Sequence, residues 1–432
     1  MESNLENLTE VADIARRVQS AARQLAREKT AAKDDALQRM AEALVDQEAA
    51  ILSANTVDLE AAHRRGLDAA FVDRLALSPA AIAQMAAALE ELTRLPDPVG
   101  GYDEQWVRPN GLQVGKKRIP LGVIGIIYES RPNVTSDAAG LCLKSGNGVI
   151  LKGGSDAFAS NRAVYTALRQ GIAKSRLSAA SHDAVGFIDT TRREAVQEML
   201  GLDQYIDVII PRGGKALIDF VRTHARMPVI KHDEGICHLV IDGSARAEDV
   251  DAIAINAKTH RPGVCNTVET LLVTDDGVEA HLARVLTKLA AHGVRLHLCA
   301  RSMAVARQSD ISPELLFEAS DEDYRTEYLA LALSVRVVAD LDAAIAHIDQ
   351  YSSRHTESLI TQRLAASQQF VDQVDSSVVM INASTRFSDG GQLGLGAEIG
   401  ISTTRMHAYG PMGLKELTAT KFVVIGDGQI RT

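Results

Sequence analysis

One cysteine stands where a thiol could act as a nucleophile. Cys265 follows the turn Arg261-Pro262-Gly263 and comes shortly before "VETLLV", an apolar run of the kind that forms strands. A loop in this position can hold a side chain toward a substrate. The neighbouring cations Lys258, His260 and Arg261 favour the thiolate, which is the reactive form of cysteine. We therefore interpret Cys265 as a candidate for covalent catalysis.

The other cysteines have settings that are typical of structural residues. Cys142 and Cys237 lie in the apolar runs "GLCLKS" and "GICHLV", and Cys299 ends a strand-like run. Buried cysteines are most often small core side chains. The chain has no CxxC pair, so we predict no metal site, and it has no G-x-S-x-G serine motif. Cys265 is therefore the favoured nucleophile.

A polar residue after another strand could complete such a site. In "YESRPNVTSD", Asn133 follows a strand-like run and a proline. A side-chain amide in that place can donate a hydrogen bond to a developing oxyanion. The alternative is an ordinary turn residue, because asparagine after proline is common in turns.

Two further turns have a composition that suits a phosphate-rich ligand. In "VILKGGSDA", Lys152 ends a strand and Gly153-Gly154 lead to a helix near Ser155. In "DVIIPRGGKAL", the turn Arg212-Gly213-Gly214 repeats this arrangement. Backbone N–H groups at a helix start bind anions, and each turn has a cation beside it. The alternative is a pair of ordinary strand-to-helix turns. The stretch 394–400, G-x-G-x-x-x-G, follows no strand directly and favours a substrate-side loop over a dinucleotide turn.

Composition limits the class of protein. The chain has 432 residues, which is enough for two or three domains, and a formal net charge of −10, which disfavours a nucleic-acid surface. The start "MESNLENLTEVADIARR" is acidic and lacks the apolar run of a signal peptide. No stretch reaches the roughly 18 apolar residues that span a bilayer. We therefore expect a cytoplasmic protein with no membrane contact.

The order of the elements predicts an α/β fold. Apolar residues recur at helical spacing through the first hundred positions, up to the break "LPDPVGG". Short apolar strands then alternate with helices, which indicates a parallel sheet covered on both faces. A second alternating block begins near residue 239 and predicts another α/β domain.

Together these segments resemble the aldehyde dehydrogenase superfamily and, within it, the gamma-glutamyl phosphate reductase family. The resemblance rests on "PLGVIGIIYESRPNVTSDAAGLCLKSGNGVILKGGSDA", "HDEGICHLVID", "KTHRPGVCNTVETLLV" and "GLGAEIGISTTRMHAYGPMGLKELTATKFVV", in that order. It implies a Rossmann-type cofactor domain with the N-terminal helices (1–101 and 119–238) and a catalytic domain carrying Cys265 (239–411). It also implies an oligomerisation arm and tail (102–118 and 412–432).

The resemblance assigns roles to matching positions. Cys265 becomes the nucleophile, and Asn133 takes the place of the oxyanion-hole asparagine. Lys152 matches a lysine that meets the adenosine ribose, with Gly153, Gly154 and Ser155 following it. Gly213-Gly214, after Arg212, match the turn that faces the pyrophosphate, and Glu327 matches a glutamate that holds the nicotinamide ribose. Many superfamily members have an acid where this chain has Ser155, and an acid would repel a 2′-phosphate; the serine favours NADPH.

The implied reaction is NADPH-dependent reduction of L-glutamyl 5-phosphate to glutamate 5-semialdehyde, a step of proline biosynthesis. The substrate is anionic, so it needs cations and hydroxyl groups; the candidates are Arg261, Ser384, Thr385 and Arg386. Hydrolytic relatives use a glutamate upstream of the cysteine, but Glu234 in "IKHDEGICH" is out of register, and we assign it no role. A hydrolytic NAD(P)-dependent aldehyde dehydrogenase and a non-catalytic binding protein are the alternatives.

The same resemblance implies an assembly. "YDEQWVRPNGLQVGKKRIP" predicts a hairpin around Asn110-Gly111, and "TATKFVVIGDGQIRT" predicts another strand. An isolated hairpin is at best marginally stable in water, so this one needs a surface on which to lie. We expect a homo-oligomer built by these two segments, with a possible functional coupling to glutamate 5-kinase. The alternative is that both segments pack within their own subunit.

Overall fold

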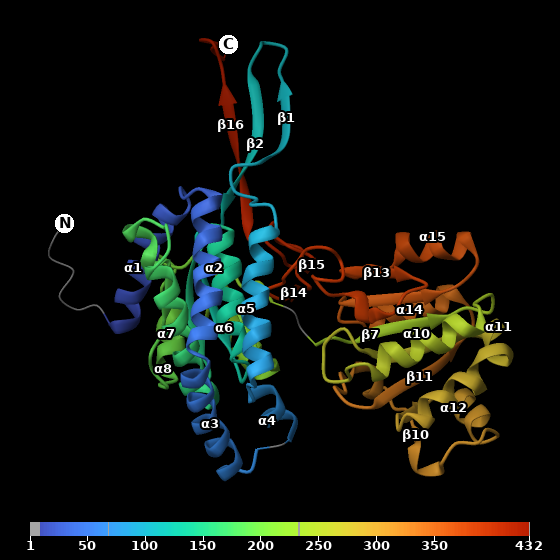
Figure 1. Ribbon diagram of the computed structural model, residues 1–432. Helices are drawn as coiled ribbons and strands as arrows, with labels where there is room; N and C mark the ends of the chain where they lie inside the picture. The colour runs from blue at the N-terminus through green and yellow to red at the C-terminus, as the bar shows by residue number, and fades with distance from the viewer. Residues whose placement is uncertain (1–8, 68, 232–233, 432) are drawn as a thin grey trace. The chain divides into compact units, whose positions relative to one another are not determined.

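The N-terminal region is helical, as its apolar spacing predicts (Figure 1). The computed structural model describes residues 9–67, 69–231 and 234–431, so the acidic stretch 1–8 discussed above lies outside the described residues. The side chains of Thr9 and Ser78 each accept a backbone N–H at a helix N-terminus, where such donors lack partners inside the helix. The helices are α1 (Glu10–Leu25), α2 (Thr30–Asp46), α3 (Glu48–Arg64), α4 (Ala69–Leu75) and α5 (Pro79–Arg94).

A four-stranded parallel sheet follows, in the order β5-β4-β3-β6. Every residue of β3 and β4 is buried, because both faces of the sheet are covered. The α/β prediction is confirmed for this part of the chain. The strands are β3 (Val123–Tyr128), β4 (Gly148–Gly153), β5 (Val185–Phe187) and β6 (Val208–Arg212).

Helices cover the two faces of this sheet. On one face, α1 packs with α8 and α9, and its Val18 lies against Gly148 and Gly186 of the sheet. On the other face lie α7, which stacks Tyr165 on Phe187, and α6, with α2 and α5 packed behind it. The additional helices are α6 (Asn133–Lys144), α7 (Phe158–Ala173), α8 (Glu194–Leu200) and α9 (Lys215–His224).

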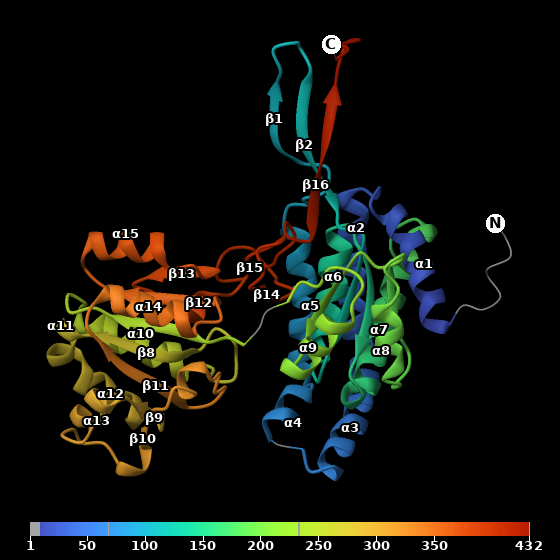
Figure 2. The ribbon, with the colours of Figure 1, turned by 180° about the vertical axis from the view of Figure 1, so that it is seen from behind.

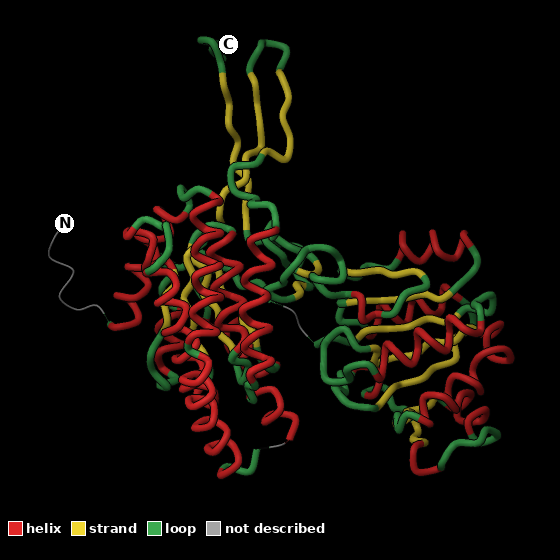
Figure 3. The backbone as a smooth tube through the Cα atoms, viewed as in Figure 1, coloured by secondary structure: helices red, strands yellow, loops and turns green. Residues whose placement is uncertain are grey.

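The arm is a three-stranded antiparallel sheet in the order β1-β2-β16. It consists of β1 (Tyr102–Val107), β2 (Gln113–Pro120) and β16 (Thr418–Ile425). The turn between β1 and β2 contains Gly111 at φ 86°, a backbone conformation that favours glycine. The predicted hairpin is therefore confirmed, and the C-terminal strand pairs with it. Figure 3 shows these strands extending away from the helices that cover the parallel sheet.

A second parallel sheet has seven strands in the order β10-β9-β11-β8-β7-β12-β13. Its strands are β7 (Cys237–Ile241), β8 (Val268–Thr274), β9 (Arg295–Leu298), β10 (Leu316–Glu318), β11 (Ala332–Val338), β12 (Thr356–Ile360) and β13 (Val378–Ile381). One face packs against α10 and α12, and the other packs against α14 and α15 (Figure 2). The helices are α10 (Ala247–Thr259), α11 (Asp275–Gly277), α12 (Ala283–Ala291), α13 (Ala300–Ala306), α14 (Leu341–Tyr351) and α15 (Leu364–Gln373).

The chain forms two compact units. Unit 1 comprises Met1–Lys231, Gly394–Gly400 and Met412–Thr432, and unit 2 comprises His232–Leu393 and Ile401–Pro411. The glycine-rich stretch 394–400 therefore belongs to unit 1. The short strands β14 (Ile401–Ser402) and β15 (Gly410–Pro411) pair within unit 2. Among the described residues, no helix is long and apolar enough to cross a bilayer, and no cluster of side chains has the composition of a metal site.

Candidate active site

Cys265 lies on the connection between α10 and β8 in unit 2 and is half-buried. Its carbonyl oxygen accepts a hydrogen bond of 3.2 Å from the thiol of Cys237. Cys142 and Cys237 are fully buried, and burial raises the pKa of both thiols. Burial also acts to raise the pKa of Cys299, but hydrogen bonds from Ser302 and from backbone N–H groups lower it overall. The loop position predicted for Cys265 is therefore present.

A glycine fixes the backbone at Cys265. Gly235 approaches so closely that an added Cβ would lie 2.1 Å from the Cys265 carbonyl oxygen. The Gly235 N–H acts to lower the pKa of the Glu327 carboxyl. Burial raises the pKa of this carboxyl, and the nearby Glu234 raises it further. The structure thus brings Glu327 to the same backbone segment that contacts the candidate nucleophile.

Two residues that flank the Cys265 loop in the sequence form a buried ion pair with each other. Lys258, from the end of α10, contacts Glu269 of β8 at 2.6 Å, and both side chains are fully buried. The other carboxylate oxygen of Glu269 accepts the Leu329 N–H at 3.3 Å. Burial lowers the pKa of Lys258 and raises that of Glu269 to about 7. Lys258 therefore pairs with Glu269, a partner that the sequence analysis did not predict when it gave Lys258 as a cation that favours the Cys265 thiolate.

Arg386 lies near two other predicted residues, Arg261 and Cys265. Burial lowers the pKa of Arg386, the nearby Arg261 guanidinium lowers it further, and the Cys265 thiolate acts in the opposite sense. The Nε of Arg386 contacts the Nδ1 of His260 at 3.3 Å. Both Arg261 and Cys265 therefore act on the charge of Arg386.

The residues before Arg386 form its turn. The Ser384 hydroxyl accepts the Arg386 N–H at 3.3 Å and begins the short helix η6 (Thr385–Phe387). Thr385 is fully buried, and its hydroxyl has no hydrogen-bond partner among the described residues. Ser384 therefore shapes the arginine loop, and the Thr385 hydroxyl keeps its hydrogen-bonding capacity.

Asn133 is the first residue of α6 in unit 1, and its side chain is exposed. Its Nδ2 donates to the carboxylate of Asp137 at 2.9 Å, one helical turn further along. Sequence reasoning missed Asp137, although the spacing of four residues in "NVTSD" places the two side chains on one face of a helix. Asn133 and Cys265 belong to different units.

The two predicted anion turns lie together. Tyr128, at the end of β3, pairs with Gly153 on one side and with Arg212 on the other. Lys152 is buried, burial lowers its pKa, and its Nζ donates to the Gly153 carbonyl at 2.9 Å. Ser155 is exposed at the start of η1 (Ser155–Ala157). Both turns therefore flank the carboxyl end of one strand, where open sheets of this type bind ligands.

The second turn already holds an internal anion. The Gly214 N–H donates to the carboxylate of Glu129 at 2.9 Å, and an added Cβ on Gly213 would lie 2.4 Å from the same oxygen. Arg212 lies beside Asp137, whose pKa its guanidinium lowers, and beside Gly400, where an added Cβ would meet Arg212 Nη1 at 2.4 Å. The side chain of Arg212 thus acts on Asp137 of α6, the helix that begins at Asn133.

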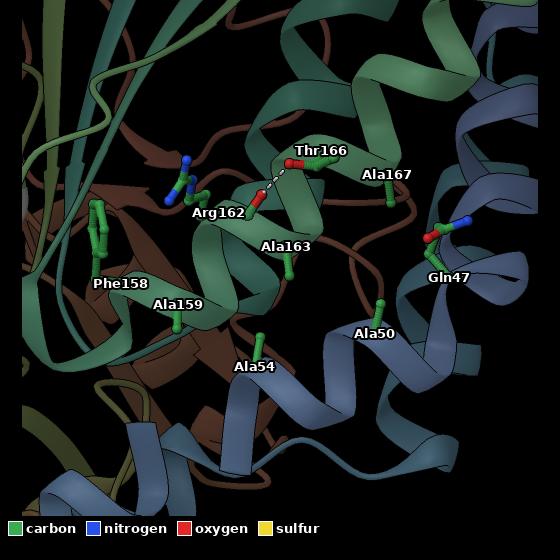
Figure 4. Close-up of a pocket in the computed structure, with 9 residues that line it drawn as sticks. All are labelled: Gln47, Ala50, Ala54, Phe158, Ala159, Arg162, Ala163, Thr166 and Ala167. Atoms are coloured by element: carbon green, nitrogen blue, oxygen red, sulfur yellow. Dashed lines mark hydrogen bonds between the residues drawn. The ribbon is translucent and has the colours of Figure 1, made fainter. Parts of the chain in front are cut away.

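A shallow hollow between α3 and α7 is a separate feature of unit 1 (Figure 4). Its lining is largely alanine, with Phe158 and Arg162 of α7 and Gln47 at the start of α3. Thr166 donates to the Arg162 carbonyl within α7 at 2.8 Å. Since polar groups do not converge here, we assign no ligand to this hollow.

Comparison with known proteins decides the family. A gamma-glutamyl phosphate reductase from Citrifermentans bemidjiense is 52% identical over 425 residues, covering 98% of this chain and 99% of that protein. The chain belongs to the gamma-glutamyl phosphate reductase family. The crystal structure of the gamma-glutamyl phosphate reductase from Thermotoga maritima matches with a TM-score of 0.93 and 43% identity, covering 98% of this chain and 100% of that one.

More distant structures share the fold of the gamma-glutamyl phosphate reductase family. An acetylating aldehyde dehydrogenase from Geobacillus thermoglucosidasius matches with a TM-score of 0.70 at 14% identity, covering 98% of both chains. The aldehyde dehydrogenase-like fold expected from the sequence is thereby confirmed. No protein-family model matches the chain.

Proposed function

We propose that this chain reduces L-glutamyl 5-phosphate to glutamate 5-semialdehyde and phosphate, with NADPH as the reductant and a thioester on Cys265. The observation that carries the proposal is the half-buried loop cysteine that interacts electrostatically with Arg386, close to Arg261, in a member of this family. An acyl phosphate is anionic, so cations beside the nucleophile attract it and favour the thiolate. Gamma-glutamyl phosphate reductases are oxidoreductases of proline biosynthesis.

The first chemical step uses residues of this chain. The Cys265 thiolate attacks the acyl carbon, and the carbonyl oxygen takes up negative charge. The second N–H of the Asn133 amide, which Asp137 does not engage, is the donor that we assign to this oxyanion. Losing one such donor typically lowers the rate by about 10²–10³. Phosphate then leaves with its electron pair and needs no strong acid.

The substrate anions match the cations of unit 2. Arg261 and Arg386 suit the phosphate and the α-carboxylate, since guanidinium groups bind such oxygens in a bidentate manner. The Thr385 hydroxyl, which has no partner among the described residues, suits a substrate oxygen. Ser384 contributes by shaping the loop of Arg386.

The two turns of unit 1 fit a nicotinamide dinucleotide. Lys152, Gly153, Gly154 and Ser155 would hold the adenosine ribose, and Gly213 and Gly214 would face the pyrophosphate. For Gly214 this requires its N–H to exchange the Glu129 carboxylate for a phosphate oxygen. Glu327, in unit 2, would hold the nicotinamide ribose. Ser155 is exposed and uncharged, and Arg65 offsets the charge of the adjacent Asp156, so the turn does not repel a 2′-phosphate, which favours NADPH. When bound, the cofactor supplies the hydride that reduces the thioester to the aldehyde level.

A hydrolytic aldehyde dehydrogenase is the less favoured reading. Hydrolysis needs a base that activates water at the thioester, and phosphate release does not. Glu234 acts on Glu327 and raises the pKa of that carboxyl, and the Gly235 backbone acts on the same carboxyl. We assign Glu234 no role as a base.

The test is the Cys265→Ala variant. It should show no reduction of glutamyl phosphate and retain NADPH binding, measured by fluorescence titration. Cys142→Ala is the matched control, because that cysteine is buried in α6 of the other unit. Substantial turnover by Cys265→Ala would refute the covalent mechanism. In the reverse direction, semialdehyde oxidation should require phosphate or arsenate, whereas a hydrolytic enzyme would require neither.

We also propose that the arm builds a homo-oligomer. Its outer strand β16 exposes Phe422, Val424 and Ile425, and Val107 of β1 is exposed as well. Apolar side chains on an exposed sheet are typical of surfaces that pair with another chain. A cytoplasmic location and a functional coupling to glutamate 5-kinase remain expectations from the family resemblance.

A further inference from the structure

The side chain of Asn133 is held by a residue of its own helix. Its Nδ2 donates to Asp137 Oδ2 at 2.9 Å, and the Ser136 hydroxyl donates to the Asn133 carbonyl at 2.9 Å. The same hydroxyl lies 3.5 Å from the other Asp137 oxygen. The first turn of α6 is thus cross-linked by three polar side chains.

This geometry restrains an otherwise free amide. Asn133 is exposed at the start of a helix, where asparagine side chains can turn back to hydrogen-bond neighbouring backbone groups. The bond to Asp137 favours one orientation of the amide. Because one N–H is engaged, the other is left pointing away from the helix turn and available as a donor.

A carboxylate beside an oxyanion site needs a compensating charge. Arg212, at the end of β6, acts on the Asp137 carboxyl and lowers its pKa, although burial raises that pKa overall to about 6. The groups that act on this carboxyl are Asn133 and Ser136 from α6 and Arg212 from β6. The guanidinium offsets a negative charge that would otherwise repel a developing oxyanion.

We propose that Asp137 is a positioning residue, which fixes the Asn133 amide by accepting one of its N–H groups so that the other meets the oxyanion. This inference rests on the proposed role of Asn133 in acyl transfer. A group misplaced by about 1 Å can lower a rate by about 10²-fold, so the restraint is worth a measurable factor in kcat.

The experiment is a double-mutant cycle on the full-length enzyme. We compare Asn133→Ala, Asp137→Ala and the double variant by the rate of NADPH oxidation with glutamyl phosphate. Asn133→Ala should lower kcat by about 10²–10³, the usual cost of losing an oxyanion donor. Asp137→Ala should lower kcat by about 10² with little change in the KM for NADPH. The double variant should be no slower than Asn133→Ala alone, because Asp137 acts only through Asn133.

A conservative variant and a control separate positioning from folding. Asp137→Asn keeps an oxygen that accepts the Asn133 N–H, so it should recover most of the rate lost in Asp137→Ala. Asp207 provides the control, because its carboxylate accepts the Val123 N–H at 2.7 Å at the amino-terminal end of β3 and β6, whereas Asn133 and Asp137 follow the carboxyl end of β3. Asp207→Asn should leave kcat unchanged.

The outcomes distinguish this inference from the proposed function. If Asn133→Ala keeps the wild-type rate, the oxyanion role itself fails. If Asn133→Ala is slow but Asp137→Ala is as fast as the wild type, or if the two losses multiply in the double variant, the positioning role fails and the oxyanion role stands. Loss of folding would appear in the circular dichroism spectrum, and Asp137→Asn then carries the test.

Discussion

Gly235 and Cys265 are in direct backbone contact, because an added Cβ on Gly235 would lie 2.1 Å from the Cys265 carbonyl oxygen and 2.8 Å from its Cα. Real side chains do not tolerate such distances against backbone. The Gly235 N–H meanwhile acts to lower the pKa of the Glu327 carboxyl. One glycine therefore contacts the backbone of the candidate nucleophile and also acts on Glu327, the proposed ligand of the nicotinamide ribose.

The first prediction follows from that contact. Gly235→Ala should displace the Cys265 loop and lower kcat by about 10²-fold or more, since small displacements of a reacting group are costly. Gly263→Ala is the matched control on the same loop, because an added Cβ there would lie 3.8 Å from the Leu329 carbonyl oxygen, an ordinary contact. Steady-state kinetics on both variants checks this. Equal rates for Gly235→Ala and the wild type would show that the contact does not constrain the nucleophile.

Cofactor preference gives the second prediction. Ser155→Glu should lower kcat/KM with NADPH far more than with NADH, since a carboxylate repels the 2′-phosphate. Thr166→Glu adds the same charge on the exposed face of α7 and should leave the ratio of the two cofactors unchanged. A wild-type enzyme that prefers NADH would contradict the assignment.

The third prediction concerns the buried pair Lys258–Glu269. Glu269→Ala should lower the free energy of unfolding by about 3–5 kcal/mol, because it leaves a buried ammonium without its partner. The double variant Lys258→Met/Glu269→Leu should be close to the wild type or more stable. Urea unfolding followed by fluorescence measures both. Glu248→Ala, which removes a weak exposed contact with Arg246 in the same unit, should change little. Additive losses in the double variant would show that the pair is not coupled.

The fourth prediction is a pH dependence of stability. The pKa of Asp137 is raised from 3.8 to about 6, mainly by burial. The folded protein therefore holds this proton more tightly than the unfolded chain, and its unfolding free energy should fall as the pH rises from about 4 to about 6. Asp137→Asn should lack this part of the decrease. Denaturant titrations of both proteins across that range test it, and parallel curves would contradict the shifted pKa.

The arm gives the fifth prediction. The full-length chain should be at least a dimer by light scattering, and a chain ending before Thr418 should lose that assembly, because β2 would lose its partner strand. A chain that begins at Thr9, which keeps the hydrogen bond at the start of α1, is the control and should leave the assembly intact. A monomeric full-length protein at micromolar concentration would refute the oligomer.

Much of the fold could be read from local patterns. The continuous apolar runs of β3 and β4 predict strands buried on both faces, and Asn110-Gly111 predicts the turn of the arm. The loop position of Cys265 followed from the Pro-Gly turn before an apolar strand. These features depend on neighbouring residues, which a sequence displays directly.

The rest depended on contacts between distant segments. The sequence predicts Lys258 as a cation for the thiolate, but the structure pairs it with Glu269 on the next strand, inside the core. Glu129 reaches the Gly214 turn, 85 positions away, and Gly235 meets Cys265 through close packing of two backbones. Nothing in the spacing of these residues specifies such contacts, because the sheet order determines them.

The pairing of β2 with β16 has a consequence for biosynthesis. Arg118 and Thr418 are hydrogen-bonded although they are 300 positions apart. During translation, the hairpin β1–β2 leaves the ribosome long before its third strand exists, and a hairpin alone is marginally stable. The strands of both parallel sheets are therefore synthesised before the arm can form. Subunit association through the arm would then be a post-translational event, which limits premature pairing between nascent chains.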